Sequence, residues 1–194
     1  MSDIIIQNLD KAFGEKKVFD NFSALFKEGE VSFVMGNSGC GKTTLLNILM
    51  GLETADSGII SGVPEKIGAV FQEDRLCEEF RAVTNIRMVM EQFRYREAEA
   101  IVREHLTRLG FEAEDLKKKV KDYSGGMKRR VASARAVLFN GDALFMDEPF
   151  KGLDVNTKKQ TIDYVKEYTK GKTVIIVSHD REEAELLGGS RIRI

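Results

Sequence analysis

The sequence lacks a long hydrophobic run, has few cysteines and carries no excess of one charge. No apolar stretch approaches the roughly 20 residues that a membrane-spanning helix needs, so a separate chain would have to cross any membrane at which this protein works. The two cysteines, Cys40 and Cys77, do not make a disulfide framework, and a reducing cytoplasm is the simplest setting. The first residues lack the basic and apolar regions of a signal peptide.

Basic and acidic residues are balanced, with 30 against 31 and a formal net charge of -1. This composition provides no global basic field that would recruit DNA or RNA, so we predict no nucleic-acid partner. The run 117–119 consists of three lysines, which is typical of a solvated patch.

The pattern of apolar residues indicates an α/β fold with one helical insertion. The chain has 194 residues, 42% of them hydrophobic, which suits one domain with a sizeable core. Strand-like runs and helical spacing alternate near both ends of the chain, whereas helical spacing alone fills the middle. We predict a single domain over 1–194, with a catalytic core at 1–72 and 124–194 and a helical subdomain at about 73–123. A turn is predicted at 11–14, and the predicted strands are 3–9, 18–26, 31–35, 59–60, 67–71, 143–146, 173–177 and 191–194.

Residues 36–44 read Gly-Asn-Ser-Gly-Cys-Gly-Lys-Thr-Thr, which matches the phosphate-binding pattern G-x-x-x-x-G-K-[ST]. An apolar run precedes the motif and helical spacing follows it, as a phosphate loop between a strand and a helix requires. Glycines let several backbone N–H groups point at one anion, to which the helix N-terminus adds partial positive charge. The predicted ATP-binding residues of this loop are Gly36, Asn37, Ser38, Gly39, Cys40, Gly41, Lys42, Thr43 and Thr44.

Two side chains of this loop have specific predicted roles, and a second acidic motif supports them. Lys42 can reach the β- and γ-phosphates, and the Thr43 hydroxyl can bind Mg²⁺. The apolar run 143–146 ends in Asp147 and Glu148, followed by a proline. Asp147 is placed to approach the Mg²⁺ shell, and Glu148 to polarise an attacking water as general base. A strand that simply ends in a polar turn is the alternative.

Ser124, Gly125 and Gly126 open another predicted helix with small residues. Such a start is a second anion site, because its N–H groups are exposed and no side chain obstructs them. Alone the motif is also an ordinary loop before a helix.

Together these motifs resemble those of the ATP-binding-cassette (ABC) ATPases, the nucleotide-binding subunits of ABC transporters. The resemblance covers nearly the whole chain, and the ordered set is highly specific. It implies a P-loop NTPase of the ABC type: a mixed sheet core, an antiparallel β edge and an inserted helical subdomain. The set comprises Phe13, the 36–44 loop, Gln72, Tyr123 to Met127, Asp147 with Glu148, Gly152 to Asp154, and His179.

The resemblance implies roles for the nucleotide-contacting members of this set. Phe13 looks like the aromatic that stacks on adenine, with Val18 nearby, although a phenylalanine buried in the core is the alternative. Gln72 looks like a residue that touches Mg²⁺ or the water, which makes Thr43, Gln72 and Asp147 the predicted metal ligands. His179 looks like the histidine that contacts the γ-phosphate and orders the attacking water.

Other members point to a second subunit. Ser124, Gly125, Gly126 and Met127 look like the signature that acts on the γ-phosphate of the opposite subunit, and Asp154 like the aspartate that crosses the dimer interface. Met127 departs from the family, which usually has glutamine there. Several motifs look most like the importer branch that handles nitrate, sulfonate and taurine.

The implied function is hydrolysis of ATP by a head-to-tail dimer, with Mg²⁺, to power solute transport. The expected partners are a second copy or a heterodimeric ABC subunit, and a transmembrane permease that contacts Gln72 to Phe80. An extracytoplasmic binding protein is left open as a further partner. The expected location is cytoplasmic, peripheral on the inner face of the membrane. The alternatives are a soluble ABC ATPase that acts as a mechanical or regulatory module, and a P-loop phosphotransferase.

Overall fold

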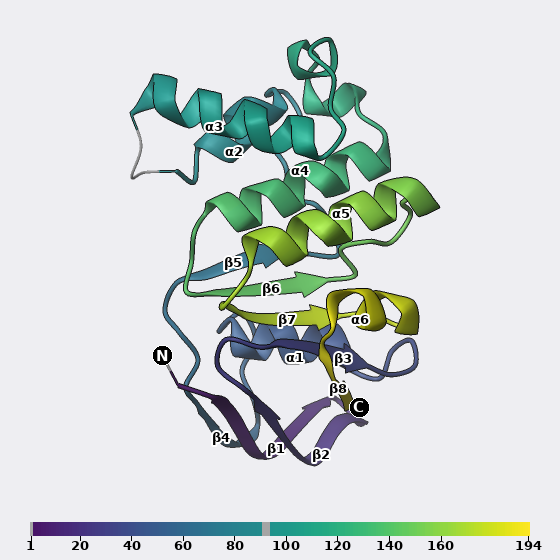
Figure 1. The fold of residues 1–194 in the computed structure, drawn as a ribbon. Coiled ribbons are helices and arrows are strands. Elements are labelled where there is room, and N and C mark those ends of the chain that lie inside the picture. Colours follow the sequence, from purple (N-terminus) through teal and green to yellow (C-terminus); the bar gives the residue numbers. More distant parts are fainter. Residues whose placement is uncertain (1, 91–93) are drawn as a thin grey trace. The chain divides into compact units, whose positions relative to one another are not determined.

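The computed structural model describes residues 2–90 and 94–194 (Figure 1). They form two compact units, which are described separately here. The first unit contains the residues up to Ile67 together with Asp142–Glu148 and Lys170–Ile194, and the second contains Gly68–Gly141 and Pro149–Thr169. The prediction of an α/β fold is therefore confirmed, since the first unit carries the sheets and the second is largely helical.

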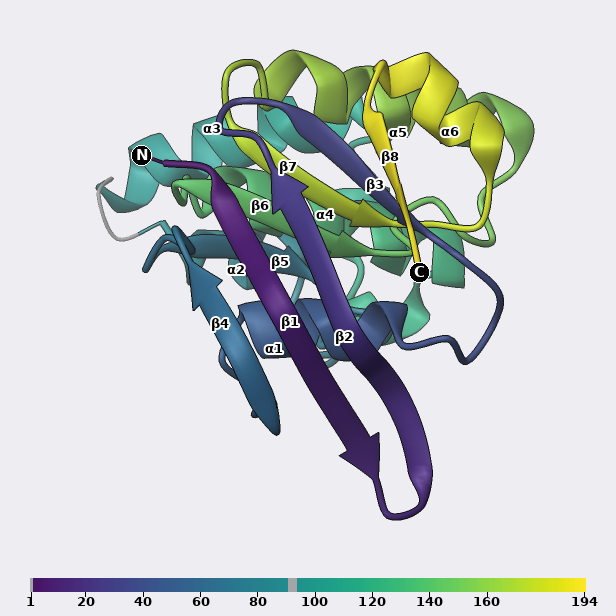
Figure 2. The same cartoon turned by 90° about the horizontal axis from the view of Figure 1, so that it is seen from below.

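A three-stranded antiparallel sheet forms one part of the first unit. It consists of β1 (Ile4–Phe13), β2 (Lys16–Phe26) and β4 (Ser57–Ser61), in the order β2-β1-β4 (Figure 2). Alternate side chains of β1 point to opposite faces, so Ile4 and Ile6 are buried while Ile5 is exposed.

The predicted turn at 11–14 is wrong in its position. β1 continues to Phe13, which pairs with Lys16, and Gly14 with a φ of 59° makes the reversal. Lysine and phenylalanine at 11 and 13 therefore belong to the strand, and the register of β1 with β2 shifts on both sides of Lys11.

A parallel sheet forms the other part of the first unit. Its strands β3 (Val31–Met35), β6 (Ala143–Asp147), β7 (Thr173–Val177) and β8 (Ser190–Arg193) lie in the order β6-β7-β3-β8. β6 and β7 are buried along their whole length, which explains why their sequences are apolar without alternation. Helices α1 (Lys42–Leu49) and α6 (Arg181–Leu187) follow β3 and β7 in the chain.

The core of the first unit joins the two sheets to α1. Both the antiparallel strands and the parallel strands contribute buried side chains to one cluster, which holds α1 and the start of the 36–44 loop in place. Its largest fully buried members are Phe26, Phe145, Ile4, Ile6, Leu9, Leu45 and Leu46. Because parallel strands end at a common edge, the segments after β3, β6 and β7 meet there.

The second unit contains most of the helices. β5 (Ile67–Val70) starts at the boundary, followed by α2 (Ala82–Arg87), α3 (Tyr95–Arg108), α4 (Gly125–Leu138) and α5 (Val155–Tyr168). Two 3₁₀ turns, η1 (Asp115–Lys117) and η2 (Val120–Asp122), precede α4. α4 packs against α2, α3 and α5. The compact unit is thus larger than the predicted helical subdomain, whose limits stay a prediction.

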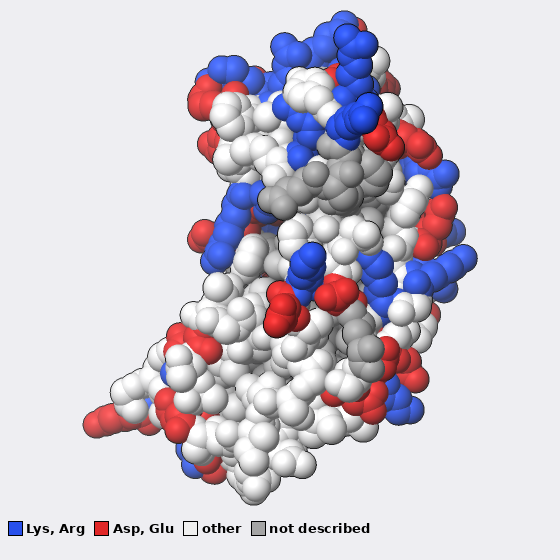
Figure 3. Space-filling model, turned by 90° about the vertical axis from the view of Figure 1, so that its left-hand side faces the viewer, with Lys and Arg blue, Asp and Glu red and all other residues white. Residues whose placement is uncertain are grey.

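Charged side chains of both signs are intermingled on the face of the helical unit that Figure 3 shows in its upper part. Each lysine of the run 117–119 has an acidic partner within 2.9 Å, namely Glu114, Asp115 and Glu79 in turn. Exposed pairs of this kind contribute little to stability. The run is a solvated, charge-balanced patch, as predicted.

Candidate active site

The phosphate loop connects β3 to α1, and packing requires two of its glycines. A Cβ on Gly36 would lie 2.6 Å from Cys40 Sγ, and a Cβ on Gly41 would collide with Val18. Gly41 also has a φ of 106°, which side chains rarely tolerate. α1 begins without a side-chain cap or an acidic residue in its first turn. Its first N–H groups therefore have no competing side-chain acceptor when an anion approaches.

Lys42 is buried, with 8% of its surface exposed, and its ammonium curls over its own loop. Nζ donates to the carbonyl oxygens of Gly36 at 2.9 Å and Asn37 at 2.8 Å, and lies 3.9 Å from Cys40 Sγ. Neutral carbonyls are weaker partners for an ammonium than phosphate oxygens, because charge-assisted hydrogen bonds are about twice as strong. The loop thus holds a cation that a phosphate can draw away from the carbonyls.

Thr43 and Asp147 meet at the edge of the parallel sheet. Thr43 Oγ1 donates to Asp147 Oδ2 at 2.6 Å, although 104 positions separate them in the chain. Within residues 2–90 and 94–194, no three His, Cys, Asp or Glu side chains form a metal cluster. Mg²⁺ usually binds through one or two carboxylates completed by phosphate oxygens and water. The hydroxyl and carboxylate therefore fit Mg²⁺ that arrives with a nucleotide, and do not fit a self-contained metal site.

Glu148 and His179 lie next to this pair. Glu148 has a φ of 47°, which is rare for a non-glycine residue, and its amide donates to the carbonyl of Val177 at 2.9 Å. His179 Nδ1 lies 3.4 Å from Glu148 Oε1. The Glu148 side chain is 16% exposed and the His179 side chain 65% exposed. A carboxylate and an imidazole in contact can both accept or hold a proton at the reacting end of a nucleotide.

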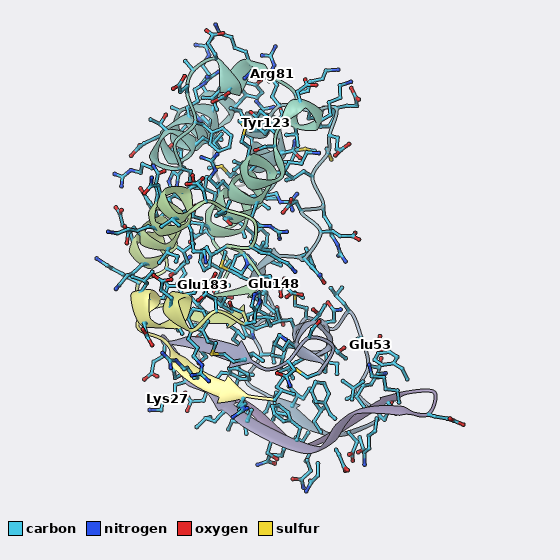
Figure 4. All side chains as sticks on the ribbon, turned by 90° about the vertical axis from the view of Figure 1, so that its right-hand side faces the viewer. Lys27, Glu53, Arg81, Tyr123, Glu148 and Glu183 are labelled. Atoms are coloured by element: carbon cyan, nitrogen blue, oxygen red, sulfur yellow. The ribbon has the colours of Figure 1, made fainter. Side chains whose placement is uncertain are left out.

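The turn that carries His179 is fixed on both sides. The Ser178 hydroxyl accepts from the amide of Asp180 at 3.0 Å and donates to Glu183 Oε2 at 2.5 Å. Ser178 and Glu183 are buried, and Glu183 is labelled with Glu148 in Figure 4. Asp180 caps α6 by accepting from the amide of Glu182 at 3.0 Å. The buried serine and glutamate hold the backbone on either side of an exposed imidazole.

The structure settles one alternative at the tip of the β1–β2 hairpin. Phe13 is 48% exposed, so it is not a core residue. Val18 is half-buried, packs against the core and lies against Gly41 of the phosphate loop. Phe13 lies on β1, which pairs with β2, the strand that carries Val18. Its exposed ring is available to a flat ligand.

Residues 124–127 lie in the second unit. Ser124 is the N-cap of α4, and its Oγ accepts from the amide of Met127 at 3.2 Å. A Cβ on Gly126 would lie 3.1 Å from Leu153 Cδ2, so this glycine is packed against the segment before α5. A Cβ on Gly125 would meet no atom within 4 Å in the part of the chain that the structure describes. Packing inside this unit therefore explains the glycine at 126 and not the one at 125.

Asp154 and Gln72 also belong to the second unit. Asp154 caps α5, since its Oδ1 accepts from the amides of Asn156 and Thr157 at 3.1 Å. Hydrogen bonds from Thr157 lower the pKa of the Asp154 carboxyl. Gln72 is exposed. Its predicted contact with Mg²⁺ would bring a residue of one unit to residues of the other, and stays a prediction.

Two arginines of α4 hold the main chain of residues 71–75, a role that the sequence did not predict. Arg129 donates to the carbonyls of Phe71 and Gln72, both at 2.8 Å. Arg135 donates to the carbonyls of Asp74 at 2.9 Å and of the next residue at 2.7 Å. Main-chain carbonyls accept hydrogen bonds whatever the residue type, so the pattern of side chains does not predict these contacts. The only available signal is that α4 carries arginines where its other inward positions are small or apolar.

The fold and the site define a P-loop nucleotide-binding protein. Residues 19–151 match the family described as ABC transporter, and the chain belongs to that family. It is an ATPase of the ABC type, and the resemblance seen in its motifs is confirmed.

Relatives and a solved structure agree. The bicarbonate transport ATP-binding protein CmpD of Synechococcus elongatus is 34% identical over 95% of this chain and 72% of its own length. The taurine import ATP-binding protein TauB of Jannaschia sp. is 35% identical over 97% of this chain and 76% of its own length, in agreement with the predicted branch. A dimeric ATP-binding cassette with bound ADP and phosphate is 28% identical, with a TM-score of 0.86 over 98% of this chain and 94% of its own.

Proposed function

We propose that this chain is the subunit that binds and hydrolyses ATP to drive solute transport by a separate transmembrane protein. The observation that supports this proposal most strongly is that three features meet at one edge of the parallel sheet. They are the phosphate loop, the Thr43–Asp147 pair and the Glu148–His179 pair. These groups supply an anion cradle, oxygen ligands and a candidate base within a single compact unit.

Phosphate binding is assigned to the whole 36–44 loop. Its N–H groups hold the phosphates, and Lys42 exchanges its carbonyl partners for phosphate oxygens. Thr43 and Asp147, joined by Gln72, hold Mg²⁺, which would neutralise charge that develops on the phosphates. Phe13 stacks on the adenine, with Val18 beside it.

Glu148 is proposed to accept the proton of the attacking water, and His179 to contact the γ-phosphate. The strained backbone at Glu148 supports this role, because a left-handed conformation at a strand end is maintained at a cost. The contact between the two side chains, of which Glu148 directly follows Asp147 in the chain, supports an acceptor pair beside the proposed metal ligands.

A second subunit completes the site in this proposal. Ser124, Gly125, Gly126 and Met127 of one copy act on the nucleotide held by the other, and Asp154 lies at the interface. The lack of any packing reason for glycine at 125 supports a close approach from outside the chain. The second subunit is either a second copy of this chain or a related ABC subunit. Closure on ATP and opening after hydrolysis follow from the gain and loss of the shared phosphate contacts.

The transmembrane partner is proposed to contact Gln72 to Phe80, at the start of the predicted helical subdomain at about 73–123. Phe80 is 47% exposed, which offers apolar surface to a partner helix. No helix in the described part of the chain is long and apolar enough to cross a membrane. The protein would then work on the cytoplasmic face of the membrane, and an extracytoplasmic binding protein would serve an importer.

The test is Glu148→Gln in purified protein. We expect turnover to fall at least about a hundredfold, because general bases typically contribute that much, and we expect MgATP to convert the variant into a dimer in light scattering. Glu185→Gln is the matched control, since Glu185 is exposed and pairs with Arg191 at 2.9 Å, away from the loop. Unchanged turnover would remove Glu148 as the base, and a variant that stays monomeric with ATP would contradict the dimer.

A further inference from the structure

Lys11 is a buried lysine in the first unit that the proposed function does not use. Only 7% of its surface is exposed. It lies on β1 two residues before Phe13, near the tip of the β1–β2 hairpin (Figure 2). A charged side chain this far removed from solvent requires partners, and those partners show what the residue holds together.

The ammonium of Lys11 is fixed by the segment that follows α1. Nζ donates to Glu53 Oε1 and to the carbonyl oxygen of Thr54, both at 2.8 Å, and lies 3.6 Å from Asp56 Oδ1. Glu53 is labelled beside the hairpin in Figure 4. The hydrogen bond to Glu53 raises the pKa of Lys11, so the side chain is charged at neutral pH.

The same segment also holds the backbone next to Lys11. Asp56 Oδ2 accepts from the amide of Ala12 at 2.7 Å, and the amide of Asp56 donates to the carbonyl of Asp10 at 3.0 Å. The end of β1 is therefore anchored on both sides of Lys11. The position of Lys11 therefore does not depend on the aromatic ring that the lysine touches.

That ring is Phe13. Lys11 Nζ lies 4.7 Å from the centroid of the Phe13 ring, within the range of a cation–π contact. Phe13 is nevertheless 48% exposed, so the ring is supported by the lysine and still available to a ligand. A ring that is already oriented loses less entropy when a flat base stacks on it.

We propose that Lys11 is a positioning residue for the nucleotide base, which it orients by supporting the Phe13 ring. The proposal rests on the proposed function, in which Phe13 stacks on adenine. The proposal predicts that Lys11 affects recognition of the base and leaves recognition of the phosphates unchanged. None of the Lys11 contacts given above reaches the 36–44 loop.

The experiment compares ATP with inorganic tripolyphosphate, which has the phosphates and lacks the base. In Lys11→Met we expect the dissociation constant of MgATP to rise about two- to fivefold and that of magnesium tripolyphosphate to stay the same, with kcat unchanged while KM rises. Lys11→Arg should restore ATP affinity, because a guanidinium keeps both the charge and the ring contact. Lys17→Met is the matched control, since Lys17 lies on the same hairpin and pairs with Asp20 at 2.5 Å.

Two outcomes would overturn the proposal. One is an equal loss of tripolyphosphate and ATP affinity in Lys11→Met, which would mean that the lysine supports the whole site. The other is an additive effect of Lys11→Met in the Phe13→Ala background, because a residue that acts through the ring has no effect once the ring is gone. If Phe13→Ala alone leaves the ratio of ATP to tripolyphosphate affinity unchanged, it is the assignment of Phe13 in the proposed function that fails.

Discussion

Lys42 shows how a single buried residue is prepared for its ligand. Its ammonium is held by two carbonyls of its own loop, at 2.9 and 2.8 Å. Binding of a phosphate then replaces neutral acceptors with charged ones, and no new side chain has to be ordered.

Lys42→Ala is expected to weaken MgATP binding at least about tenfold, because it removes charge-assisted hydrogen bonds to the phosphates. Isothermal titration calorimetry measures the effect. Lys27→Ala provides the comparison, since Lys27 is exposed and pairs only loosely with Glu30 at 3.8 Å. Normal ATP affinity in Lys42→Ala would contradict the phosphate-loop assignment.

At the scale of residues, the sequence predicts contacts between residues of recognisable motifs. It does not predict contacts between residues that belong to no motif and that only the fold brings together. The pairing of Thr43 with Asp147 was predictable, because a strand and a phosphate loop end at a common sheet edge. The contact of Lys11 with Phe13 was not, since the lysine is held there by acceptors after α1. The exposure of Phe13 likewise needed the structure.

At the scale of elements, α5 depends on Asp154, the residue that caps its start. Asp154 caps the helix through two backbone amides, and the hydrogen bonds from Thr157 lower the pKa of its carboxyl. A carboxyl whose pKa is lower in the folded chain stabilises the fold above its unfolded pKa. That contribution is lost as the pH falls through the folded pKa, below the ordinary value of 3.8.

Asp154→Ala is therefore expected to lower the urea midpoint of unfolding near neutral pH, and the difference from the unmodified protein should shrink as the pH falls below 3.8. Asp154→Asn is the matched variant, because its amide oxygen caps the helix without titrating. If the difference in urea midpoint between the unmodified protein and Asp154→Ala stays constant down to the lowest pH at which both are folded, the charge of Asp154 does not contribute to stability.

Element boundaries show which physical signals the sequence carries. The helical spacing in the middle of the chain and the helix predicted to open at Ser124 correspond to α3 and α4, each of which buries one continuous face. α2 was missed, since six residues are too few to display a helical period. The misplaced turn near Gly14 reflects a different cause: a strand end with charged residues has the composition of a turn.

At the scale of the whole molecule, the residues assigned to ATP divide between the two compact units. Lys42, Asp147 and His179 belong to the first unit, whereas Ser124 and Asp154 belong to the second. The motifs predicted this set in order along the chain but did not show the division. In the proposed dimer, the first unit of one copy holds a nucleotide, and the second unit of the other copy completes the binding site.

This division predicts two kinds of protection from hydrogen exchange in Glu148→Gln with MgATP. Amides of the 36–44 loop should be protected at every protein concentration, because one chain binds the phosphates. Amides of 125–127 should gain protection only as the concentration rises and dimers form. Gly125→Arg, added to Glu148→Gln, is the discriminating variant. A Cβ at 125 would meet no atom within 4 Å in the described part of the chain, so we expect the fold to be retained while a partner's approach is blocked. It should keep the protection of the loop and lose that of 125–127. Protection of 125–127 that does not depend on concentration would place the signature on the nucleotide of its own chain and contradict the shared site.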